Sequence, residues 1–166
     1  MWMVYTTLAT ISLLTFMLIL QDDTASTRHN ASIEAVARQM STYHDAAVSV
    51  CGTVCPAGNI SAASRLPTLS QNLTDGRFRS ISNGSGTVIT VFVRGSQYTP
   101  YSDGDVVAGM RTAFLKSTVM GAWNASTQRV ESAVVGSPGT VISTPVSATF
   151  GGYTLHDRQP VIVRAP

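Results

Sequence analysis

The sequence predicts an α+β fold in which an N-terminal transmembrane helix continues into an amphipathic helix, followed by a small β-rich domain with a second helix. Three observations support it. They are an uncharged apolar run from Trp2 to Leu20, a helical apolar stripe between Ser26 and Val50, and the β-branched segment Thr87–Arg94. The predicted division is a transmembrane anchor over residues 1–21 and an α+β domain over residues 22–166.

The apolar run is long enough to cross a bilayer. At about 1.5 Å per residue it spans about 28 Å as a helix. A cleaved signal peptide would have a basic start and small residues at its cut, but no Lys or Arg precedes this run, which ends in Met17–Leu20. We therefore expect an uncleaved anchor. Five hydroxyl residues in the run are expected either to contact a neighbouring helix or to bond the preceding turn of their own helix: Thr6, Thr7, Thr10, Ser12 and Thr15.

The charges beside the run bear on orientation and partners. The first basic residue, Arg28, follows the run, and only the α-amino group precedes it. Because the N-terminal tail is short, we expect the C-terminal domain to be exported.

Charged residues make up 12% of the chain and the formal net charge is +2. The arginines are scattered and form no basic stripe, which argues against a nucleic-acid partner.

The amphipathic helix carries its apolar residues on one face. No Gly or Pro separates it from the apolar run, so both can belong to one helix that ends before Gly52. We expect its stripe to pack on a sheet that includes Val88, Val91 and Phe92. The stripe consists of Ile33, Val36, Ala37, Met40, Tyr43, His44, Ala47 and Val48.

A second helix is predicted to begin at Ser102, which resembles a capping box with Asp105. Its buried face is predicted to contain Val106, Val107, Met110, Ala113, Phe114 and Ser117. A short helical turn is predicted within Asn59–Leu66. Further strands are predicted at Phe78–Ile81, Arg129–Val135, Thr140–Ser143, Val146–Phe150 and Pro160–Arg164.

The two cysteines, Cys51 and Cys55, are separated by three residues. Two thiols are too few for a structural zinc site, and a redox C-x-x-C motif has two intervening residues. In an oxidising compartment the pair would form a local disulfide, worth about 2 kcal/mol. The alternative is a pair of reduced, partly buried thiols.

Catalytic sets are hard to find in this sequence. Asn83–Gly86 lacks the first glycine of a nucleophile elbow. His44 lies on the helical stripe, which favours packing over catalysis, and His156 is expected in a loop or at the surface. The two glutamates, Glu34 and Glu131, show no sign of pairing. We therefore predict a protein that is not an enzyme and takes no cofactor, metal or small-molecule substrate, with a small enzyme as one alternative.

A second alternative comes from the asparagines, all five of which lie in N-x-S/T triplets. Such triplets are glycosylation acceptors and would fit a glycosylated single-pass cell-surface protein. The five residues are Asn30, Asn59, Asn72, Asn83 and Asn124.

Short motifs along nearly the whole chain resemble the PilM family of type IVb (plasmid thin pilus) biogenesis proteins. The resemblance lies in their order and spacing: Gln39-Met40, Tyr43, Ala46–Val48, Pro56, Gly58, Ile60, Leu66-Pro67, Val119–Gly121, Thr144-Pro145, Gly152-Tyr153 and Pro160–Val163.

This resemblance implies a non-catalytic part of the pilin transport apparatus or basal body in the bacterial inner membrane, with its C-terminal domain in the periplasm. Its partners would be other pilus-assembly proteins, the inner-membrane platform or the pilin. No catalytic residue carries over, and the cysteine pair is not among the shared motifs. The rival reading is a minor pilin-like structural subunit. It shares the plan of a long N-terminal helix before β-rich structure, but a basic leader, a Gly cut site and an early Glu are missing.

Overall fold

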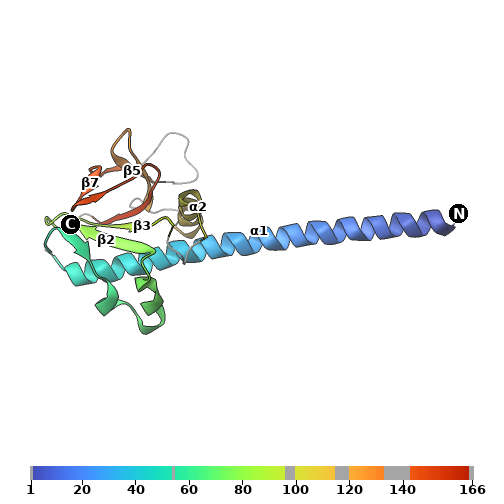
Figure 1. Ribbon diagram of the computed structural model, residues 1–166, viewed down its shortest axis with the longest axis horizontal. Coiled ribbons are helices and arrows are strands. Elements are labelled where there is room, and N and C mark those ends of the chain that lie inside the picture. Colours follow the sequence, from blue (N-terminus) through green and yellow to red (C-terminus); the bar gives the residue numbers. More distant parts are fainter. Residues whose placement is uncertain (1, 54, 96–99, 115–119, 133–142, 165–166) are drawn as a thin grey trace. The chain divides into compact units, whose positions relative to one another are not determined.

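The computed structural model describes residues 2–53, 55–95, 100–114, 120–132 and 143–164 (Figure 1). The chain divides into two compact units, residues 1–32 and residues 33–166. The first helix, α1 (Trp2–Cys51), contributes to both units, and every strand among the described residues lies in the second. The fold is α+β with antiparallel sheets.

The transmembrane anchor predicted over residues 1–21 is wrong by the criterion of helix length and hydropathy. In the part of the chain that the structure describes, no helix is both long and apolar enough to cross a membrane. The predicted continuation of this run into the amphipathic helix is confirmed, because α1 continues unbroken through Gln21 and the two aspartates after it. No Gly or Pro interrupts the sequence there, so the backbone has no reason to leave the helix.

The C-terminal part of α1 packs as its stripe predicts. All eight stripe residues are buried, with Met40, Ala37 and Ala47 fully enclosed. On the outward face, the Arg38 guanidinium pairs with the Glu34 carboxylate at 2.7 Å, one turn apart. The helix is therefore held by its apolar face, and the exposed ion pair adds little.

Within the described residues the main sheet has seven strands in the order β1-β2-β3-β9-β4-β5-β6, and every neighbouring pair is antiparallel. The last strand, β9, therefore lies in the middle of the sheet. A separate hairpin pairs β7 with β8. The bounds are β1 Gly58–Ile60, β2 Phe78–Ser82, β3 Val88–Phe92, β4 Met120–Asn124, β5 Arg129–Ser132, β6 Ser143–Pro145, β7 Thr149–Phe150, β8 Tyr153–Thr154 and β9 Pro160–Arg164.

Strand β3 is buried on both faces, which explains its nearly continuous β-branched sequence. Val88 and Phe92 belong to the core that contains the α1 stripe. Val91 belongs to a second core with Ile89, on the opposite face. The α1 stripe therefore packs on the sheet that includes Val88, Val91 and Phe92, as predicted, with Val91 on the far face because successive side chains of a strand point to opposite faces.

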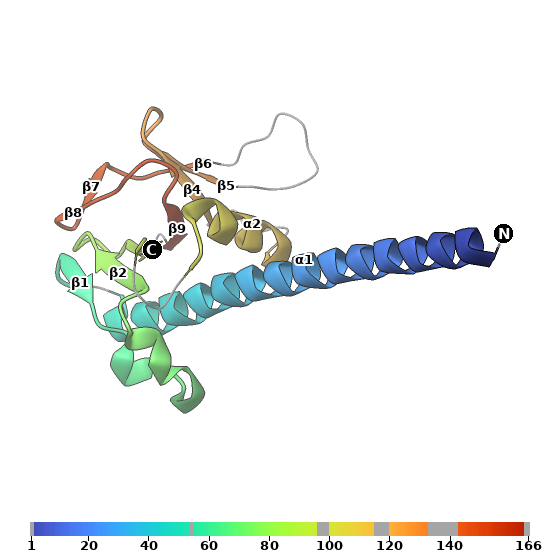
Figure 2. The same cartoon turned by 45° about the vertical axis from the view of Figure 1, so that its right-hand side comes forward.

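The second core lies between the β2–β3–β9 part of the sheet and the segments that fold over it. In Figures 1 and 2 the β7–β8 hairpin lies on the opposite side of β2 from α1. Trp123 of β4 is the largest residue of this core, and its indole N–H donates to the Val146 carbonyl at 3.1 Å. Two cores thus sandwich a single layer of strands.

Helix α2 (Asp103–Ala113) begins with the predicted capping box, in which the Ser102 hydroxyl and the Asp105 carboxylate satisfy each other's backbone N–H. Val106, Val107 and Met110 are buried as predicted, whereas Ser117 lies outside the described residues. The short helical turns are η1 (Ala63–Arg65) and η2 (Thr68–Thr74).

Candidate functional site

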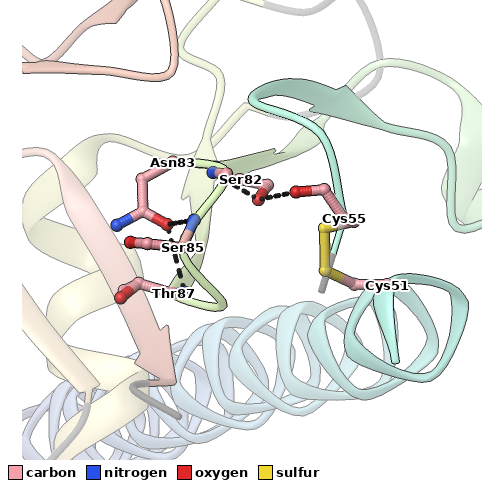
Figure 3. Close-up of a disulfide and its surroundings, with 7 residues drawn as sticks. Cys51, Cys55, Ser82, Asn83, Ser85 and Thr87 are labelled. Atoms are coloured by element: carbon pink, nitrogen blue, oxygen red, sulfur yellow. Dashed lines mark hydrogen bonds between the residues drawn. A yellow bond between two sulfur atoms is a disulfide. The ribbon is translucent and has the colours of Figure 1, made fainter. Parts of the chain in front are cut away.

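A disulfide joins Cys51, the last residue of α1, to Cys55, with their Cα atoms 5.0 Å apart (Figure 3). Gly52 follows with a φ of 65°, a left-handed conformation that favours glycine and turns the chain after the helix. The Ser82 hydroxyl donates to the Cys55 carbonyl at 3.4 Å. The disulfide therefore ties the C-terminal end of α1 to a segment that lies beside β2.

The neighbouring turn between β2 and β3 carries the Asn83–Gly86 segment considered above as a nucleophile site. The Asn83 side-chain oxygen accepts from the backbone N–H groups of Ser85 at 2.9 Å and Thr87 at 3.1 Å (Figure 3). This pattern shapes a tight turn between strands. Ser85 is thus part of a structural turn.

His44 is a packed residue, as its place on the stripe predicts. Its side chain is buried at the interface of α1 with β3, and its Nδ1 lies 2.8 Å from the Thr90 hydroxyl. That hydroxyl is also hydrogen-bonded to Ser80 at 2.6 Å. Burial, aided by the positive charge of Arg164, lowers the His44 pKa from 6.5 to about 4. At neutral pH the ring is therefore uncharged and part of a satisfied polar network.

His156 has a partner that the sequence does not suggest. Its Nε2 lies 3.0 Å from the Oδ2 of Asp103, the first residue of α2. The Asp103 side chain is buried, and its other oxygen, Oδ1, has no hydrogen-bond partner within the described part of the chain. The two residues are 53 positions apart, so no local pattern could reveal the pair.

The pair borders an open groove of about 1000 Å³ within the second unit. Its sides come from α2, β4, Glu131 of β5 and the turn before β9. Val107 and Trp123 lie behind this lining and are almost fully buried. Three arginines line it as well: Arg94, Arg111 and Arg158. In the described residues, no group of three or more His, Cys, Asp or Glu side chains could hold a metal ion.

The first unit presents a different surface. Ile11, Leu13, Leu14 and Met17 of α1 expose between 54% and 64% of their surface. Thr15, in the same stretch, donates its hydroxyl to the Ile11 carbonyl at 2.8 Å. Thr15 thus bonds to its own helix, which is one of the two alternatives expected for it. The stretch therefore presents an apolar exterior.

Comparison of the chain with known protein families, with characterised proteins and with solved structures found no match.

Proposed function

We propose that this protein is a non-catalytic component of type IVb pilus assembly that acts through protein–protein contacts made by the apolar N-terminal part of α1. The observation that carries the proposal is the exposed group of Ile11, Leu13, Leu14 and Met17. Large apolar patches on a protein surface are characteristic of interaction sites. The choice of pilus assembly rests on the resemblance to the PilM family in the order of its short motifs.

The spacing of these residues suits a helical partner. Ile11, Leu14 and Met17 follow one another at three-residue intervals, and Leu13 lies four residues before Met17. Such residues lie side by side along one helix and form a continuous ridge. A second helix, from the platform or from the pilin, would bury this ridge in the manner of helix packing.

The disulfide supports the proposed location in the periplasm, because such bonds persist in oxidising compartments. In protein alkylated as the cells are opened, and then measured by mass without reduction, we expect neither Cys51 nor Cys55 to be modified. Two alkylated cysteines would place the domain in a reducing compartment and contradict this part of the proposal.

The functional test is deletion of the gene followed by complementation. Deletion should abolish surface pili and leave synthesis and processing of the pilin intact. Wild-type protein should restore piliation, and the Leu13→Ser/Leu14→Ser double variant should not. Leu69→Ser is the matched control, because Leu69 is 97% exposed in η2 and distant in sequence from the ridge. Normal piliation in a clean deletion strain would contradict the proposal.

A minor pilin-like subunit is the second candidate, favoured by the continuity of α1 from the exposed apolar part into the stripe that packs on the sheet. Pilins share this arrangement. This role predicts that the protein is present in sheared pili in fixed proportion to other minor subunits. An assembly component should be missing from them.

A further inference from the structure

The groove beside α2 contains positive side chains without partners. Arg94, Arg111 and Arg158 are exposed, and within the described residues none of their guanidinium groups forms an ion pair or hydrogen bond. They come from three places: the chain after β3, the last turn of α2, and the turn before β9. Guanidinium groups gathered from separate elements match carboxylates geometrically, two N–H groups to two oxygens.

The acidic side chains of the groove are already engaged. Asp103 pairs with His156 at 3.0 Å, Glu131 accepts from the Asn124 amide at 2.7 Å, and Asp157 accepts from the backbone N–H of Ala125 at 2.9 Å. These acids balance the formal charge of the three arginines. A ligand would therefore be held by pairing at particular guanidinium groups more than by a general positive field.

One acceptor beside the groove has no partner. Asp103 is 7% exposed, and its Oδ1 has no hydrogen-bond partner among the described residues. This oxygen is itself closed off from solvent, so a ligand in the groove would be held by the arginines. A peptide with several acidic residues supplies carboxylates to all three guanidinium groups at once, which a single small anion does not.

The backbone at Arg158 is held in an unusual conformation. Its φ is 61°, in the left-handed region where residues other than glycine are uncommon, and its N–H donates to the Trp123 carbonyl at 2.8 Å. A glycine would adopt this turn at lower cost. The bond to β4 fixes the residue, and the chain thereby presents an arginine at the groove.

We propose that this groove binds an acidic peptide segment of a partner protein, with its carboxylates on Arg94, Arg111 and Arg158. The groove is large enough for several residues of a peptide. This surface is separate from the apolar ridge of α1, and the inference does not depend on a role in pilus assembly.

The test uses the full chain and fluorescence anisotropy at low ionic strength. The probes are fluorescein-labelled ten-residue peptides of Gly, Ser and Leu that carry three Glu residues at spacings of two, three or four, each with a matched Gln version. We expect at least one Glu peptide to bind in the micromolar range and its Gln version to bind at least about tenfold more weakly, a difference of about 1.4 kcal/mol. Binding of no Glu peptide below 1 mM (about −4 kcal/mol) would overturn the proposal.

Variants identify the surface. Arg111→Gln should weaken binding by about tenfold or more. Arg158→Gly should weaken it similarly while leaving the melting temperature unchanged or raised, which a merely structural role would not produce. Arg65→Gln is the control, since Arg65 is exposed in η1 and is not part of the groove. An equal loss in Arg65→Gln, or displacement of the peptide by inorganic phosphate at the same concentration, would show a general anion effect and reject the peptide site.

Discussion

Acidification should destabilise the second unit through His44. The folded protein holds this ring neutral, with a pKa of about 4 against 6.5 when unperturbed. Between these pH values His44 is protonated in the unfolded chain and neutral in the folded chain, so the free energy of unfolding falls as the pH falls. The linkage relation gives a loss of about 2 kcal/mol between pH 7 and pH 5, and about 3 kcal/mol once the pH is below 4.

This loss would be a large part of the stability of a small domain, about 5–15 kcal/mol. The structural reason is that a protonated ring would be a charge buried between α1 and β3, near the cation of Arg164. It could no longer accept a hydrogen bond at Nδ1. The ring therefore has to remain neutral for the helix to stay packed on the sheet.

Urea denaturation at pH 7, 6 and 5 would measure the effect. In a Trp2→Phe background, Trp123 is the sole tryptophan and its buried indole reports on the second unit. The control is His44→Asn, whose amide can replace Nδ1 toward Thr90 but does not titrate. We expect this variant to have a lower free energy of unfolding at pH 7 because packing is lost. We expect this free energy to stay constant between pH 7 and pH 5. The reasoning would be refuted if the free energy of unfolding of the wild-type protein did not fall between pH 7 and pH 5, or if that of the variant fell equally.

Two further predictions concern packing. Met40→Asp places an unpaired charge in the first core and should lower the free energy of unfolding by about 3 to 5 kcal/mol. Ala35→Asp, on the exposed face of the same helix, should change the urea midpoint little. Equal midpoints for the two variants would contradict the assignment of the buried face. Gly109→Ala would bring a Cβ within 2.4 Å of a backbone carbonyl of α1 and should destabilise by about 1 to 3 kcal/mol, even though alanine favours helices. Gly104→Ala, where the nearest atom is 3.7 Å away, should be neutral or stabilising in the same melting experiment, and the reverse order would exclude the proposed close helix contact.

Several elements could be predicted because their signals are local. The stripe of α1 repeats with the helical period, and all its members are buried. The strand Pro160–Arg164 and the capping box at Ser102 also appear where their sequences predict them. Strand β4 was missed because its sequence, MGAWN, contains a glycine and no β-branched residue. It is a strand because β9 and β5 pair with it on both sides.

The continuous helix from the apolar run to Cys51 was predicted correctly, but the transmembrane assignment of its first part was wrong. The described residues contain no helix that is both long and apolar enough to span a membrane. The apolar pattern does not decide what covers an exposed helix surface, because lipid and a protein partner both satisfy it.

By itself, the sequence determined the two helices, the strands with strong β-branched patterns and the buried side of α1, because these depend on the spacing of neighbouring residues. The tertiary structure alone decided the pairing of His156 with Asp103, the two faces of β3 and the meeting of three arginines in one groove. These arrangements join residues tens of positions apart. They follow from the order of the strands, with β9 between β3 and β4, which no local pattern in the chain encodes.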